Sequence, residues 1–126
     1  MSVQLVAGSP AEVRDLYEWL RQEPGLRPAL RLVENPPPDG SMGPVAEAVS
    51  VISDAPEVVA ALASVVIAWL RYRRGDVKIT VKRPDGGPEV ELSATRVRTL
   101  SGEQTLALTR QLETALRPPE PEEHQG

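Results

Sequence analysis

The chain has 126 residues, 14 of them basic and 18 acidic, and three of the acids, Glu120, Glu122 and Glu123, lie in its last nine positions. The remainder, with 14 basic and 15 acidic residues, is nearly neutral, so we expect no nucleic-acid partner. Cysteine is absent, which excludes disulfides and thiolate metal sites, and the first residues lack a signal-peptide pattern, so we expect a cytoplasmic protein.

The composition changes near residue 117. Residues 1–117 predict a single domain, whereas residues 118–126 (PPEPEEHQG) are rich in proline and acid and predict a disordered tail. The one histidine, His124, lies in this tail. We therefore expect it to be solvated rather than to bind a metal or act as a base.

A strand and a helix open the domain. Residues 3–7 (VQLVA) predict the strand, and Ser9, Pro10 and Glu12 then form a helix start with a cap, a first-turn proline and a returning carboxylate. Trp19 lies at the edge of the helix's buried stripe, where half-exposure is typical. The stripe consists of Val13, Leu16, Tyr17 and Leu20.

Residues 29–34 (ALRLVE) predict a second strand. A strand, a helix and a strand in succession favour a parallel pair with a right-handed crossover. Residues 35–44 (NPPPDGSMGP) then combine prolines with glycines. They form either a plain connection or an exposed binding loop with Met42 at its tip.

Two helices are predicted next. Residues 45–52 predict a short helix, which ends before the breaker at Pro56. Residues 58–70 form a run of thirteen uncharged residues. Such a run is shorter than the roughly 20 apolar residues that span a membrane in helical form.

The long helix is apolar on nearly all sides, a pattern typical of a helix enclosed by protein. We therefore expect Leu62, Val65 and Val66 to be core residues. The alternative is a helix that lies on an anionic membrane surface, held by Trp69, Tyr72 and the arginines that follow.

A hairpin follows, predicted from residues 77–82 (VKITVK) and 88–94 (PEVELSA) joined by RPDGG. On the polar side of the hairpin, Lys78 and Lys82 lie opposite glutamates, so we interpret the lysines as cross-strand partners of these glutamates. Because one face of such a sheet is solvated, helices should cover only the other face.

Ser101 and Gln104 predict a capping box, followed by a last helix that ends before Pro118. The expected fold class is therefore α/β (α+β): a two-layer sandwich with a four-stranded mixed sheet and helices on one face. The expected order of elements is β-α-β-α-α-β-β-α.

No catalytic constellation is visible. Glu89 and Glu91 would share one sheet face and could do acid–base work, but their lysine neighbours favour a solvated surface instead. We expect no enzymatic activity, no metal site and no cofactor.

Three segments, LYEWLRQEPGLR, RLVENPPPDGSMGP and AWLRYRRGDVKITVKRPDG, resemble the effector-associated constant component family, first type, of bacterial conflict systems. The resemblance runs from about Val3 to Leu116. It implies a non-enzymatic accessory component of a defence system, encoded beside variable effectors and regulatory NTPases. Such a component would couple an effector to its regulator or sense invaders.

Two functions therefore stand. The first is an adaptor that binds a protein partner, the effector or regulatory NTPase encoded nearby, with homo-oligomerisation left open. The second is a peripheral membrane component anchored by the long apolar helix and its basic end. Val6 and Val33, expected among polar residues of the open sheet face, form a further candidate surface. The candidate partner-binding residues are Trp19, Met42, Trp69, Tyr72, Arg71, Arg73 and Arg74.

Overall fold

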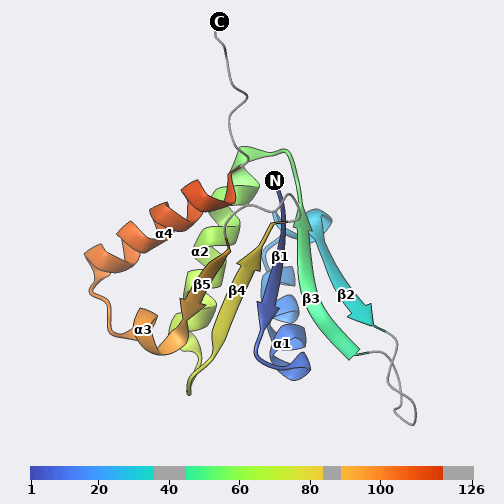
Figure 1. The fold of residues 1–126 in the computed structure, drawn as a ribbon. Coiled ribbons are helices and arrows are strands. Elements are labelled where there is room, and N and C mark those ends of the chain that lie inside the picture. The colour runs from blue at the N-terminus through green and yellow to red at the C-terminus, as the bar shows by residue number, and fades with distance from the viewer. Residues whose placement is uncertain (36–44, 84–88, 118–126) are drawn as a thin grey trace, which may run out of the picture.

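The structure is a computed structural model that describes residues 1–35, 45–83 and 89–117. Two predicted segments lie outside the described residues: the tail at 118–126 and the loop after Asn35, which contains Met42. In chain order (Figure 1) the elements are β1 (Ser2–Ala7), α1 (Pro10–Arg21), a 3-10 turn (Arg27–Ala29), β2 (Leu30–Asn35), β3 (Val45–Ile52), α2 (Pro56–Tyr72), β4 (Lys78–Lys82), β5 (Val90–Ser93), α3 (Ala94–Arg98) and α4 (Gly102–Leu116).

The strands of the described residues form one five-stranded sheet in the order β2-β3-β1-β4-β5. Every neighbouring pair is antiparallel. The expected α+β architecture is confirmed, but the predicted four-stranded mixed sheet and its order of elements are wrong. β5 also ends one residue earlier than predicted, because Ser93 caps the additional short helix α3.

β3 is the element that the sequence analysis assigned wrongly, as a short helix. Its segment, VAEAVSVI, mixes alanines and a glutamate, which favour a helix, with β-branched residues, which favour a strand. Val49 and Val51 pair with Leu5 and Val3 of β1, and all four side chains are buried. Packing of the β-branched residues in the sheet outweighs the local helix preference.

The position of β3 also overturns the predicted parallel pair. β1 and β2 both pair antiparallel with β3, which lies between them. They therefore point in the same direction without being neighbours. A strand–helix–strand succession carries this ambiguity, because it specifies direction but does not exclude an inserted strand.

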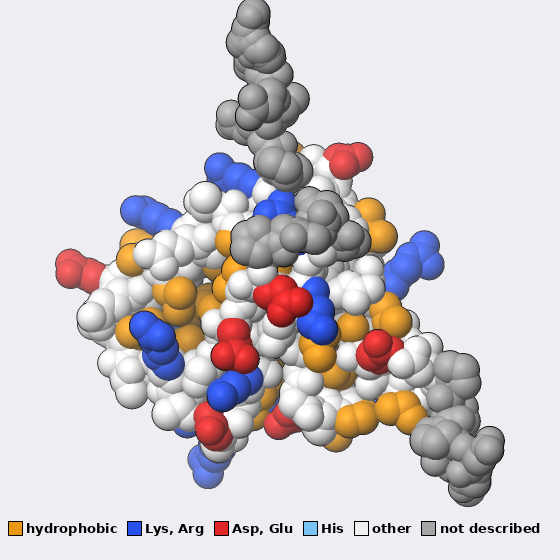
Figure 2. Space-filling view, in the orientation of Figure 1, with side chains coloured by type: hydrophobic (Ala, Val, Ile, Leu, Met, Phe, Trp, Pro, Cys, Tyr) orange, Lys and Arg blue, Asp and Glu red, His pale blue; other side chains and the backbone are white. Residues whose placement is uncertain are grey.

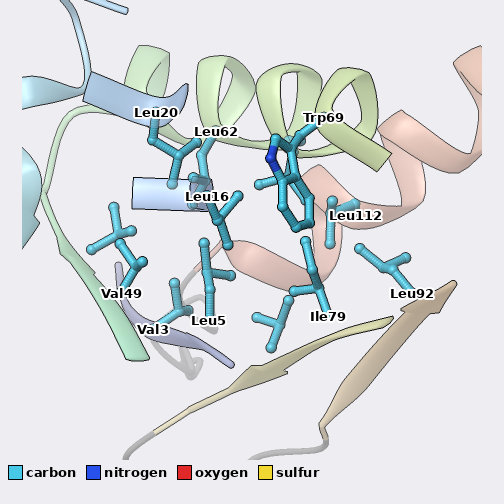
Figure 3. Close-up of a cluster of buried hydrophobic side chains, with 14 of the residues drawn as sticks. Val3, Leu5, Leu16, Leu20, Val49, Leu62, Trp69, Ile79, Leu92 and Leu112 are labelled. Atoms are coloured by element: carbon cyan, nitrogen blue, oxygen red, sulfur yellow. The ribbon is translucent and has the colours of Figure 1, made fainter. Parts of the chain in front are cut away.

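The helices lie on one face of the sheet, and the core lies between the two layers. α1 and α2 pass behind the sheet, and α4 packs along α2 towards the β5 edge (Figure 1). Leucines of α1, α2 and α4, together with Trp69, point towards the inner side chains of the strands (Figure 3). The inner strand side chains labelled there are Val3, Leu5, Val49, Ile79 and Leu92.

The opposite sheet face is open, and acidic and basic side chains are interspersed over it (Figure 2). Lys78 and Lys82 are exposed there, and Val6 and Val33 are only partly buried. Thr80, not a lysine, pairs with Glu91. Within the described residues neither lysine forms an ion pair with a glutamate, so that interpretation of the lysines is not supported.

The predicted caps of α1 and α4 are present, but among the described residues the Glu12 carboxylate does not return a hydrogen bond to the Ser9 amide. The Ser9 hydroxyl accepts a hydrogen bond from the Glu12 amide at 3.2 Å. The capping box of α4 is complete: the Gln104 amide donates to the Ser101 hydroxyl, and the Ser101 amide donates to the Gln104 side chain. These caps satisfy amides that a helix leaves unpaired at its first turn.

Candidate functional site

The candidate residues gather where the C-terminal end of α2 meets α1. Asp15 and Trp19 are four residues apart on α1 and therefore share one side of that helix. Trp69 lies in the last turn of α2, and Arg73 caps the C-terminal end of that helix. Both contact Asp15, so the two pairs face each other across the contact between the helices.

Trp69 anchors this contact from within the core. Its side chain is 1% exposed, and its indole N–H donates to the carboxylate of Asp15 at 3.2 Å. The same carboxylate forms an ion pair with Arg73. The Arg73 guanidinium lies over the Trp69 ring, 4.9 Å from its centroid, in a cation–π arrangement. Asp15 thus holds the end of α2 against α1.

Trp19 and Tyr72 extend the contact to the surface. The Trp19 indole N–H donates to the backbone carbonyl of Val65 at 3.1 Å, so this partly buried ring has a fixed orientation. Tyr72 lies against it, with ring centroids 6.0 Å apart. Tyr72 is 77% exposed, which makes it a large aromatic side chain presented to solvent on a rigid support.

Beside Trp19, the outer surface of α2 is hollowed. A depression of about 370 Å³ is lined by Trp19, Ser64, Val65 and Ala68, with polar residues of the α1 end. Ser64 is exposed, and Val65 and Ala68 are partly exposed. We call the surface formed by Trp19, Ser64, Val65, Ala68 and Tyr72 the α1–α2 surface.

The three arginines near the end of α2 do not form one patch. Arg71 donates to the hydroxyl of Thr105 on α4 at 2.8 Å, whereas Arg73 turns to Asp15 on α1. Arg74 is exposed, and no ion pair to it is found within the described residues. Arg71 lies within α2, whereas Arg73 and Arg74 follow its end at Tyr72, where the backbone is extended, so the three side chains diverge.

Sequence reasoning missed two residues of this region. Asp15 is one, although its spacing from Trp19 placed both on the side of α1 that faces α2. The other is Arg98 of α3, which donates to the backbone carbonyls of Arg73 and Gly75 and so fixes the turn after α2. Only the tertiary fold brings Arg98 to this turn, and no local pattern indicates it.

We also searched the described part of the chain for a metal site and for a membrane-spanning helix. Residues 1–35, 45–83 and 89–117 contain no group of three His, Cys, Asp or Glu side chains placed to hold a metal ion. Among the same residues, no helix has the length and apolar character needed to cross a membrane.

Comparison with known proteins yields one finding. The model of the family described as Effector Associated Constant Component 1 matches residues 6–113. No curated protein and no solved structure matches the chain. The family match confirms the resemblance inferred from the sequence, and it covers both helices of the α1–α2 surface.

Proposed function

The chain belongs to the Effector Associated Constant Component 1 family, and from this membership we propose that it is a non-enzymatic accessory component of a bacterial conflict system. In this proposal it acts as an adaptor, binding an effector or a regulatory NTPase encoded nearby. The α1–α2 surface is the proposed binding site. Its cytoplasmic location stays a prediction.

One observation carries the proposal: between its two ends, the exposed side of α2 has no charge. Between Glu57 and Arg71 the helix contains no charged residue, yet Ser64, Val65 and Ala68 reach solvent. A helix face that stays in water normally carries charged side chains. Small uncharged residues instead allow a partner to approach closely without the cost of desolvating charges.

The aromatic pair supports the same site. Tyrosine and tryptophan provide large contact areas and dominate binding energies at protein interfaces. Trp19 is held by its hydrogen bond to Val65, and Tyr72 rests against Trp19. Because these rings are ordered before binding, a partner would lose little conformational entropy in contacting them.

The absence of catalysis is part of the proposal. The carboxylate at the centre of this contact, that of Asp15, already accepts from Trp69 and pairs with Arg73. Such a carboxylate serves to hold two helices together. An adaptor needs no more than this, since rigid presentation of a surface is sufficient for binding.

The alternative function, a peripheral membrane component, is not favoured. It required Trp69 and the apolar helix to enter a lipid surface. Trp69 and Leu62 are instead buried, at 1% and 0% exposure. Burial inside the protein leaves Tyr72 as the exposed ring of that proposed anchor.

A pair of matched substitutions tests the proposal. Ser64→Arg places a charge in the α1–α2 surface, and Ser2→Arg places the same charge on the open sheet face. Affinity for the purified products of the neighbouring effector and NTPase genes is measured by calorimetry. We expect Ser64→Arg to weaken binding by about tenfold or more, and Ser2→Arg to leave it unchanged. Equal affinities for wild type and Ser64→Arg would refute this site.

A further inference from the structure

A second hollow lies on the other side of the molecule, between β5 and α4. It is a groove of about 360 Å³. Val90 and Leu92 line it from the strand, and Ala107, Leu108 and Gln111 line it from the helix. Hydrophobic side chains gather over these two elements on the face seen in Figure 2.

β5 adds an unpaired strand edge to this groove. Among the described residues it is the last strand of the sheet and pairs with β4 alone. The backbone N–H and C=O groups on its outer side therefore have no strand partner in that part of the chain, and such an edge is a template for another strand. The groove and the edge lie side by side, since both use Val90–Ser93.

A basic side chain stands at one end of the groove. Arg96 of α3, three residues beyond the end of β5, lines the groove and is exposed. Among the described residues its guanidinium has no hydrogen bond and no ion pair. An incoming carboxylate would find a cation whose charge is not already compensated.

We propose that the β5–α4 groove binds an extended segment of a partner protein, which adds to the sheet as a sixth strand beside β5. Strand geometry dictates the chemistry of this segment. Its side chains alternate between the two sheet faces, so every second residue enters the groove towards Ala107 and Leu108 and must be apolar. An acidic residue of the segment lies against Arg96. The unpaired backbone edge selects a strand over a helix as occupant.

This surface differs from the α1–α2 surface, so the two proposals stand or fall separately. The substitutions that test one, at Ser64 and at Ala107, lie on different helices. An adaptor with two such surfaces could hold two proteins at once, which raises effective concentration without any new contact.

A displayed library of random octapeptides tests the proposal with the full-length protein. Three versions serve as bait: the wild type, Ala107→Trp, which fills the groove, and Leu106→Trp, which adds the same ring one position away, outside the groove lining. We expect wild type and Leu106→Trp to enrich the same peptides, and Ala107→Trp to bind them about tenfold or more weakly. Enriched peptides should carry alternating apolar residues and an acid whose contribution is lost in Arg96→Gln.

Backbone methylation of an enriched peptide then distinguishes strand addition from other binding modes. A strand pairs through one edge only, so its amides point alternately towards and away from β5. Methylating one alternate set of amides should abolish binding, and methylating the other set should not.

Three outcomes would overturn the proposal. One is no enrichment on the wild type over Ala107→Trp. Another is enriched peptides that tolerate both methylation patterns. The third is self-association of the wild type that Ala107→Trp removes, measured by analytical ultracentrifugation, which would make a second copy of this chain the occupant.

Discussion

The carboxylate of Asp15 on α1 accepts a hydrogen bond from the buried indole N–H of Trp69 on α2 across 3.2 Å. Four residues further along the chain, at the C-terminal cap of α2, Arg73 pairs with the same carboxylate. This relationship joins the core to the surface, because it holds the end of α2 where Tyr72 emerges. Its consequences can be measured both as stability and as binding.

Replacing Asp15 should destabilise the fold in a graded manner. Asp15→Ala leaves the buried Trp69 N–H without its acceptor, which should lower the free energy of unfolding by about 1–3 kcal/mol. Asp15→Asn keeps an acceptor oxygen and should lose less. Urea denaturation followed by tryptophan fluorescence measures both variants. If Asp15→Ala unfolds at the same urea concentration as wild type, the contact contributes nothing.

The position of α2 in the core leads to a second prediction. Leu62 is fully buried between the helical layer and the sheet. Leu62→Ala should lower the free energy of unfolding by about 2–5 kcal/mol through lost burial and a residual cavity. Leu62→Asp should abolish folding, because it buries an unpaired charge. A folded Leu62→Asp variant, judged by circular dichroism, would place this residue at the surface instead.

The alternation of buried and exposed side chains along β3 leads to a third prediction. Ser50 is partly exposed on the open face and pairs with Arg31, whereas its neighbour Val51 is buried. Ser50→Asp should therefore change the free energy of unfolding by no more than about 0.5 kcal/mol, and Val51→Asp should unfold the protein. Thermal denaturation compares the two variants. Equal tolerance of both would argue against a strand at this position.

β3 also marks the limit of what the sequence predicts of the fold. α1 and α4 were predicted because apolar residues recur at helical spacing after recognisable caps, and α2 was predicted from its long uncharged run. β4 and β5 were predicted because their residues alternate. β3 alternates poorly, since Ala48 and Val49 are adjacent and both buried, next to an irregularity in its pairing with β2. The secondary structure of this segment is determined by its pairing with the neighbouring strands β1 and β2.

The candidate site could be predicted only in part, for a similar reason. A sequence identifies Trp19, Trp69 and Tyr72 as large rings near helix surfaces, but whether each is buried depends on what packs against it. Trp69 is in the core and Tyr72 is exposed, although they are only three positions apart in the sequence. Contacts between helices, such as that from Trp69 to Asp15, follow from the fold and leave no local signal.

Tyr72 provides a fourth prediction, in which stability and binding separate. Because its side chain is 77% exposed, Tyr72→Ala should change the free energy of unfolding by about 0.5 kcal/mol or less. Its contact area at an interface should nevertheless make the same change weaken partner binding by about tenfold. Ile52→Ala, which removes an exposed side chain from the open sheet face, is the control. A Tyr72→Ala variant with unchanged affinity would leave the ring without a role in binding.

Site-specific photo-crosslinking in the native host tests the central claim most directly. A photoreactive residue is introduced at Ala68, within the α1–α2 surface, or at Gln4, on the open sheet face, and crosslinked proteins are identified by mass spectrometry. The account predicts that the position 68 probe captures the product of a neighbouring effector or NTPase gene and that the position 4 probe does not. Capture of such a product from position 4 alone would contradict the account.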